Sequence, residues 1–361
     1  MDEIIKVMTT PESRANKTTP KTIFSQRSKS KHPKQNDISV IKKYPERKSQ
    51  MSEFVIIPDT GCELTKELRA RFGVDDIVRG LLIYPDGHSE LTDPDWNNIT
   101  PEEFFGTMSE KKQLFTTSLP TPDEFDTVYR RHLSAGKDIL ALSLSSALSG
   151  TYGASCTAAE KLRKEFPERK IVCIDTLRYS AAMALLCAYA NDLRSKGKTL
   201  EETAEAIVAT RKTLHQSGIL DDLFFCRRMG RASGMAAVMG TLVGIKPMAD
   251  FNANGLCHVI GKVRGYKAGY RACIDYMKAT ITDPENQLII VMHSNRLEEA
   301  QKYCAMIEEE LHPRDTLITS VGQACGPNVG PGLIAAVYFG TELSEDLSAE
   351  KALCDSILQK K

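Results

Sequence analysis

The sequence predicts an α/β protein, in which an N-terminal parallel α/β/α sandwich is followed by a C-terminal mixed α/β domain of two layers. Two observations lead to this prediction. Apolar runs of strand length alternate with helical patterns as far as residue 215, which is typical of a parallel sheet covered on both faces. Beyond that point an Asn-Ala-Asn-Gly turn divides residues 245–263 into two extended pieces, which indicates a hairpin.

The elements of the N-terminal half follow from apolar runs and helix-capping patterns. Strands are expected at residues 53–59, 138–144 and 170–175, with two further extended pieces around the Pro-Asp-Gly turn of residues 76–91. Helices are expected at residues 65–72, 121–135, 150–166 and 180–196 and after Thr199. Two Thr-x-x-Glu capping boxes, at Thr121 and Thr199, mark the starts of two of these helices.

In the C-terminal half the predicted hairpin is followed by a helix, and the alternation then resumes. A strand is expected at residues 287–293, a helix at 298–311 and two strands near 316–321 and 333–339. The whole chain is accordingly divided into a disordered basic arm (1–51), an N-terminal α/β domain (52–212), a C-terminal α/β domain (213–342) and a helical tail (343–361).

The basic arm is predicted from charge and composition. Residues 1–50 contain twelve Lys and Arg against five Asp and Glu, although the whole chain is neutral with 47 of each sign. This segment has no apolar periodicity, so it lacks the means to form a core. It could tether the protein to nucleic acid or a membrane, or simply be a solvated extension, which is the more common role of such a charge run.

Cysteine spacing and hydropathy exclude several classes of protein. The ten cysteines form no CxxC pair and no Cys/His cluster, which disfavours a zinc site and a disulfide framework. Several lie in apolar runs, as expected for buried thiols in a reducing cytoplasm. No secretory signal and no run of eighteen apolar residues is found. We therefore expect a cytoplasmic protein without integral membrane association and without a metal.

The segment SLSSALSGTYGAS, residues 143–155, is the most suggestive stretch, because it joins the end of a predicted strand to the start of a predicted helix. Ligands of doubly wound sheets bind at such strand ends. Ser149 is expected to be the N-cap, and the free backbone N–H groups from Gly150 onward favour one negative charge. A second loop with three hydroxyls, including Thr117, precedes another capped helix and could meet the same anion.

Each of these features also has a simpler interpretation. Ser149 could cap its helix and bind nothing, and the hydroxyls near Thr117 could serve ordinary turns. A catalytic serine would need a base, but no histidine lies in a motif typical of a triad partner. Asp59 and Asp175 each end a strand and could share a metal, although turn or cap duty is more common. The glycine-rich residues 326–332 match no phosphate-binding motif and are interpreted as a shaped loop.

A one-sided basic run lies in the C-terminal half. Between Arg227 and Arg271 there are eight Lys or Arg residues and a single acidic residue, Asp250. Such a run indicates a surface that meets an acidic partner or a phosphorylated ligand. Nucleic acid is disfavoured, because neither aromatic interleaving nor a recognised binding motif accompanies the charge.

Taken together, these segments resemble the DegV family of fatty-acid-binding proteins, which includes the acyl-carrying subunits of bacterial fatty acid kinase. The resemblance extends over roughly residues 53–340 and is carried by eight motifs in order: Asp59-Thr60 after the first strand, TSLPTPDEF, SSALSGTY, IDT-x-x-x-S, DDLFFCRRMGRAS, GTLVGIKPM, K-x-R-x-x-K and VGPG. It implies a fatty acid bound between two domains, with its carboxylate held by Thr117 and Ser149 beside Gly150.

The resemblance also implies roles for three basic residues and shows two departures. Arg231 would lie near the ligand's head group, whereas Arg264 and Lys267 would form part of a kinase-docking surface. Leu119 stands where the family commonly has Gln, and Asn328 where it usually has His before the last glycine-rich loop, so head-group affinity or transfer could differ.

The expected function is that of a carrier, not an enzyme. It binds a long-chain fatty acid, needs no cofactor and presents the carboxylate to a fatty acid kinase that forms an acyl phosphate for lipid metabolism. Burying about a dozen methylenes at roughly 0.8 kcal/mol each would supply the affinity. Two alternatives remain, an acyl hydrolase or transferase that uses Ser149 as nucleophile, and a lipid-sensing regulator without a kinase partner.

Overall fold

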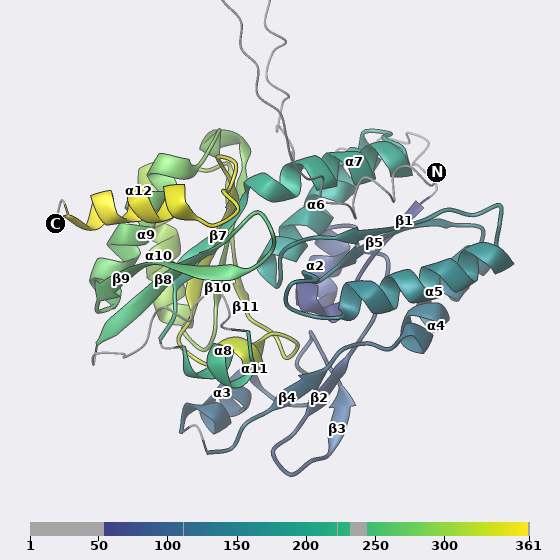
Figure 1. Cartoon of the computed structure of the whole chain (residues 1–361), viewed down its shortest axis with the longest axis horizontal. Helices are drawn as coiled ribbons and strands as arrows, with labels where there is room; N and C mark the ends of the chain where they lie inside the picture. Colours follow the sequence, from purple (N-terminus) through teal and green to yellow (C-terminus); the bar gives the residue numbers. More distant parts are fainter. Residues whose placement is uncertain (1–53, 111, 222, 232–243, 360–361) are drawn as a thin grey trace, which may run out of the picture. The chain divides into compact units, whose positions relative to one another are not determined.

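The computed structural model describes residues 54–110, 112–221, 223–231 and 244–359 (Figure 1). These residues belong to one compact unit, Ile38–Lys361. The predicted basic arm, residues 1–51, lies outside the described residues and stays a prediction.

The described strands form three sheets. They are β1 (Phe54–Pro58), β2 (Leu81–Ile83), β3 (Ser89–Leu91), β4 (Thr116–Ser118), β5 (Asp138–Ser143), β6 (Ile171–Asp175), β7 (Leu214–Ile219), β8 (Ile245–Phe251), β9 (Cys257–Arg264), β10 (Leu288–His293), β11 (Asp315–Ser320) and β12 (Ile334–Phe339). The sheet orders are β1-β5-β6, β11-β10-β12-β7-β8-β9 and β3-β2-β4.

The described α-helices cover these sheets or connect their strands. They are α2 (Lys66–Arg71), α3 (Pro101–Ser109), α4 (Pro122–Ser134), α5 (Thr151–Glu165), α6 (Ala181–Ser195), α7 (Leu200–Thr210), α8 (Phe224–Arg228), α9 (Tyr266–Thr280), α10 (Leu297–Leu311), α11 (Gly326–Val329) and α12 (Ser348–Gln359). Both predicted capping boxes are present, so α4 starts after Thr121 and α7 after Thr199.

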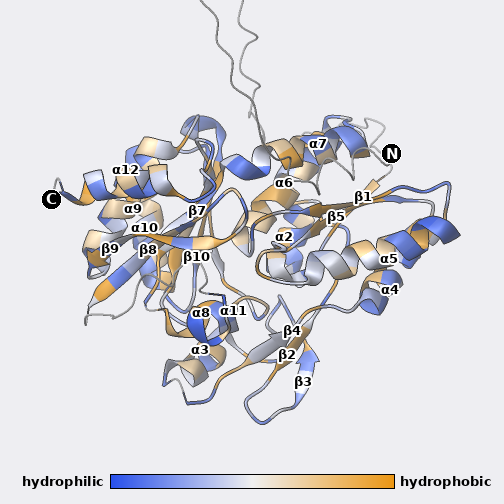
Figure 2. Ribbon diagram, in the orientation of Figure 1, coloured by the Kyte–Doolittle hydropathy of each residue, from blue (hydrophilic) through white to orange (hydrophobic). Residues whose placement is uncertain are grey.

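The sheet β1-β5-β6 confirms the predicted parallel sandwich. All of its pairings are parallel, as Phe54 with Asp138 and Ile139 with Ile171 illustrate. Helices α4 and α5 contact it, and α6 and α7 contact it as well. One apolar cluster joins α4 and α5 to this sheet, and a separate one joins α6 to it, so the sheet is buried on both faces. Figure 2 shows β1, β5 and α6 as mostly hydrophobic, whereas α4 presents hydrophilic residues.

The six-stranded sheet is mixed, as predicted for the C-terminal half. Strands β10 and β11 are parallel, whereas β10-β12, β12-β7, β7-β8 and β8-β9 are antiparallel. Helices α9, α10 and α12 share an apolar cluster with one face of this sheet. Helix α6 also contacts β7, β10 and β12, so it packs between the parallel sheet and the six-stranded sheet. The domain boundary between residues 212 and 213 remains a prediction, and a single core cluster includes residues from both sides of it.

The sheet β3-β2-β4 contains the two extended pieces predicted around the Pro-Asp-Gly turn, which form the antiparallel strands β2 and β3, but its third strand corrects one expectation. Residues Thr116–Ser118, expected to lie in a loop, form the edge strand β4 and pair antiparallel with β2, with Thr117 opposite Leu82. The glycine-rich residues 326–332 were also expected to be a loop. Their first four residues instead form the short helix α11, and positive φ angles at Gly330 and Gly332 end it.

Candidate functional site

A cavity of about 290 Å³ lies at the carboxyl ends of β1 and β5 and extends onto the six-stranded sheet. Its walls include residues that directly follow β1, namely Asp59 to Gly61, and Leu144, which directly follows β5. The opposite wall comes from β7, β8 and β12. The cavity therefore lies where parallel α/β sheets usually bind ligands.

One end of the cavity is rich in hydroxyl groups. Its polar lining residues are Asp59, Thr60, Thr92, Thr117, Ser118, Ser149, Thr151 and Asn328. The Thr92 hydroxyl donates to Thr60 Oγ1 over 3.0 Å, and the oxygens Ser149 Oγ and Thr151 Oγ1 are hydrogen-bonded at 2.8 Å. Hydroxyl groups can both donate and accept, so this end can turn several donors toward one acceptor.

Ser149 lies at the start of α5 but is not its N-cap. The N-cap is Gly150, which makes no side-chain capping bond, and the helix begins at Thr151. Ser149 Oγ accepts instead from the backbone N–H of Thr151 over 3.3 Å, because the preceding residues turn tightly, with the Ser149 N–H donating to the Ser145 carbonyl. The first amides of α5 nevertheless lie beside the cavity, as an anion site at a helix start requires.

The four residues predicted to bind a ligand are close together. Thr117, Ser149 and Arg231 all line the cavity, although they come from β4, the loop after β5 and the segment after α8. Gly150 is not among the lining residues, but a Cβ there would lie 3.4 Å from the lining residue Leu119, so Gly150 is next to the cavity wall. That these residues hold a ligand stays a prediction.

Arg231 is the cationic member of the lining. Its side chain is exposed, and it donates to the carbonyl oxygens of Leu148 and Met229, the first over 3.4 Å. A guanidinium that remains in contact with water attracts an anion over a distance but binds it weakly. Arg231 thus suits the entrance of the cavity better than its buried end.

Asp59 places an acid in the cavity wall. Its carboxylate accepts from the backbone amides of Gly61 over 2.7 Å and Leu144 over 2.8 Å, which fixes the two loops that follow β1 and β5. Burial raises the pKa of Asp59 to about 6, although these two amide hydrogen bonds oppose the shift. Its turn-forming role agrees with the simpler of the two interpretations made from the sequence.

A second buried acid, Glu63, lies behind the same wall. It accepts hydrogen bonds from the Ser180 hydroxyl and, over 3.1 Å, from the backbone N–H of the lining residue Cys325. Burial raises the pKa of Glu63 to about 7, with these hydrogen bonds acting in the opposite direction. Glu63 therefore connects the start of α6 to the segment before α11.

The other end of the cavity is apolar and has a floor of small residues. Gly218, Ala249 and Ala335 line it from three neighbouring strands, and Phe251 and Leu333 stand beside them. A Cβ at Gly218 would lie 2.3 Å from the Ile334 carbonyl oxygen, so only glycine fits there. Small side chains on a sheet leave a trough that an apolar chain can fill.

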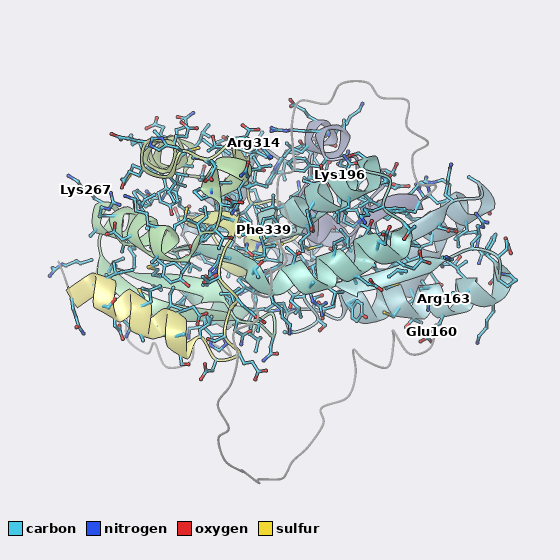
Figure 3. The ribbon with its side chains drawn as sticks, turned by 90° about the horizontal axis from the view of Figure 1, so that it is seen from above. Glu160, Arg163, Lys196, Lys267, Arg314 and Phe339 are labelled. Atoms are coloured by element: carbon cyan, nitrogen blue, oxygen red, sulfur yellow. The ribbon has the colours of Figure 1, made fainter. Side chains whose placement is uncertain are left out.

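The two residues predicted to dock a partner lie outside the cavity lining. Arg264 ends β9 and Lys267 lies in the first turn of α9, and both side chains are exposed. Figure 3 shows Lys267 at the outer edge of the ribbon, whereas Phe339 of β12 lies inside it. The structure thus separates this basic surface from the hydroxyl-rich cavity end.

A metal site at Asp59 and Asp175 finds no support in the geometry. Asp175 Oδ1 accepts from the backbone amides of Ser146 and Leu177 over 3.1 and 3.0 Å, which is the role of a turn residue. Within the described ranges, no group of three or more His, Cys, Asp or Glu side chains is placed to hold a metal ion. No helix in those ranges is long and apolar enough to cross a bilayer.

Several lining residues were not singled out as site residues from the sequence. Thr92 and Thr151 are hydroxyl residues next to β3 and at the start of α5, and only the pairing of β2, β3 and β4 brings Thr92 to Thr60. Gln216 lies in a strand whose six residues are all buried, so no alternation marks the face that meets the cavity. Asn328, noted only as a departure, also lines it.

The fold and the cavity define a class of protein: an α/β protein whose cavity has a hydroxyl-rich end and an apolar end. Residues 53–341 match the profile of the family described as uncharacterised proteins of the DegV family. A DegV domain-containing protein of Clostridium perfringens is 30% identical over 290 residues, which covers 80% of this chain and 98% of the relative. The chain belongs to the DegV family.

Solved structures of the same fold contain bound fatty acids. A DegV family protein from Thermus thermophilus, described by its fatty acid binding, matches with a TM-score of 0.69 and 25% identity, covering 80% of this chain and 100% of that one. The fatty acid kinase B3 protein of Streptococcus pneumoniae, loaded with linoleic acid, matches with a TM-score of 0.68 and 21% identity, covering 80% and 99%. The predicted fold and family are thereby confirmed.

Proposed function

We propose that the protein binds a long-chain fatty acid in this cavity and presents its carboxylate to a fatty acid kinase. The observation that carries the proposal is the cavity's division into a hydroxyl-rich end, with Thr117 and Ser149, and an apolar end floored by Gly218, Ala249 and Ala335. A fatty acid has the same division. The fatty acids bound by relatives of the same fold support the proposal.

The carboxylate is held by Thr117 and Ser149 next to Gly150, with Arg231 at the entrance. Hydroxyl donors and helix amides stabilise a buried carboxylate, which would otherwise be costly to bury. Without a tight ion pair, a carboxylate oxygen stays nucleophilic. In the kinase complex this oxygen attacks the γ-phosphorus of ATP, ADP leaves, and an acyl phosphate forms.

The protein itself acts as a carrier without cofactor or catalytic group. Ser149 Oγ is hydrogen-bonded to Thr151, and no histidine is among the hydrogen-bond partners described for it. A cytoplasmic location is supported by the ten cysteines, all of which are free thiols. Mass spectrometry of the purified protein tests this role, because a carrier releases free fatty acid, whereas an enzyme using Ser149 would retain a covalent acyl-serine.

The kinase is proposed to dock on the exposed residues Arg264 and Lys267. Arg264→Ala and Lys267→Ala should keep the bound fatty acid but slow acyl-phosphate formation by a cognate kinase. Lys302→Ala changes an exposed lysine on α10 and is the matched control. Normal turnover by both docking variants would contradict the docking surface, and loss of lipid from them would assign these residues to binding instead.

A further inference from the structure

One polar side chain stands out in the apolar part of the cavity. Gln216 lines the cavity from β7, on the same face as Gly218, and Ala249 and Phe251 of the neighbouring strand line it as well. Only 4% of Gln216 is exposed. Its amide Nε2 lies 3.2 Å from the sulfur of Met292, which is a weak acceptor.

The amide oxygen of Gln216 is left without a hydrogen bond. Oε1 is buried, and none of the described residues donates to it. A buried polar atom without a partner is costly, and the great majority of such atoms in folded proteins have a protein, water or ligand partner. An unsubstituted hydrocarbon tail could not supply one, because methylene groups carry no donor.

We propose that the preferred ligand is an acyl chain that carries a hydroxyl group within its tail, and that Gln216 selects it. The inference rests on the proposed function, since it concerns the tail of the fatty acid placed in this cavity. A hydroxyl both donates and accepts, so it pairs with the amide whichever of the two amide ends faces the chain.

Gln216 lies two residues from the floor residue Gly218 on the same face of β7, which places this hydroxyl within the tail. Leu220 also lines the cavity and lies four residues further along the chain, which corresponds to roughly 13 Å of extended chain. The Gln216 amide is therefore distant from the end of β7 that leads into α8 and on to Arg231. A polar residue at this depth is selective, because a site built to hydrogen-bond a ligand hydroxyl discriminates against the analogue that lacks it.

The test compares stearic acid with its monohydroxy derivatives that carry the hydroxyl at successive mid-chain carbons. Delipidated full-length protein is titrated with each acid, and equimolar mixtures are offered in competition with mass spectrometric detection of the retained acid. One hydroxy isomer should bind about five-fold to a hundred-fold more tightly than stearic acid. Gln216→Met, which preserves size and removes the amide, should abolish the preference.

Ile219→Val, a buried exchange on β7 outside the cavity lining, is the matched control and should leave the preference unchanged. Equal or tighter binding of stearic acid than of every hydroxy isomer by the wild type would overturn the assignment and leave the proposed function intact. A preference that persists in Gln216→Met would also overturn it. Failure of every acid to bind the wild type would overturn the proposed function as well. The competition experiment needs only wild-type protein, so it stays decisive if a variant folds poorly.

Discussion

The two ends of the cavity are built in opposite ways. The hydroxyl-rich end collects single residues from separate short segments, such as Thr60 after β1, Thr117 in β4 and Ser149 after β5. The apolar end comes from adjacent strands of one sheet, where the register places Gly218 opposite both Ala335 and Ala249. Residues of the hydroxyl-rich end can therefore change one at a time, whereas a change in the apolar wall also affects the packing of the sheet.

The largest effect is expected from Ala335→Leu in the apolar floor. The larger side chain should displace about four methylenes of the tail, at roughly 0.8 kcal/mol each, and so weaken a long-chain acid about two-hundred-fold. Titration with palmitate and octanoate measures the effect, because the shorter acid should be affected less. Equal losses for both acids would indicate a general distortion of the sheet, which a thermal unfolding curve would also reveal.

The next largest effect is expected in the pH dependence of the protein's stability, which arises from Glu63 behind the hydroxyl-rich end of the cavity. Its pKa rises from 4.5 to about 7 on folding, so the folded protein binds the proton more tightly. Stability from this group is present below pH 4.5 and is lost as the pH rises through about 7. Glu63→Gln, which carries no charge, should gain stability relative to wild type between about pH 5 and about pH 8, by up to about 3 kcal/mol.

Urea unfolding of the variant and the wild type at about pH 5 and about pH 8 measures this difference in stability. The exposed Glu342→Gln serves as the control and should change the stability little at either pH. A constant difference between Glu63→Gln and wild type across this range would show that the buried carboxyl is already ionised at the lower pH.

Substitutions of Thr117 and Ser149 test the hydroxyl-rich end of the cavity. Thr117→Val or Ser149→Ala should each weaken a free fatty acid by about 1–3 kcal/mol, because a charged acceptor loses one donor. The double variant should lose less than the sum if one hydroxyl partly replaces the other. Titration beside the methyl ester is the measurement, and the ester's affinity should hardly change. Equal binding of the free acid by all variants would place the carboxylate elsewhere.

The smallest effect is expected from Arg231→Gln at the entrance. An exposed guanidinium contributes at most about 1 kcal/mol, and salt screens it. The variant should bind the free acid up to about five-fold more weakly than wild type at roughly 0.01 M salt. This difference should vanish at about 1 M salt, because salt screens the contribution of Arg231 in the wild type. Arg228→Gln, an exposed neighbour that does not line the cavity, is the control. A loss that persists at high salt would assign Arg231 a direct bond to the ligand.

Much of the fold was predictable because its signals are local. Apolar runs located β1, β5 and β6, and the capping boxes at Thr121 and Thr199 located two helix starts. Strands β2 and β3 were predicted as extended pieces, but β4 was not, because a strand of three residues carries little pattern and its pairing joins distant segments. Thr117 was therefore expected in a loop, although it is held in a strand.

The geometry of the cavity could not be predicted from the sequence, and ligand binding by its residues stays a prediction. Thr117, Ser149 and Arg231 do reach one cavity, but the N-cap of α5 lies at Gly150, because a local turn redirects the Ser149 side chain. Gln216 gave no signal, since nothing in the buried run of β7 marks one residue as unpartnered. A missing hydrogen bond depends on every surrounding strand and can only be seen once the strands are assembled.

The order of the six-stranded sheet has a consequence for the timing of synthesis. Strand β12 lies between β7 and β10, yet it is the last strand of the sheet to leave the ribosome. Residue Phe339 emerges 120 residues after Ile219, which takes about 6–24 s at common elongation rates. During that interval β7 has one open edge and the cavity lacks the wall formed by Ala335, so we expect ribosome-bound chains truncated before β12 to capture no labelled fatty acid, and lipid loading to follow translation.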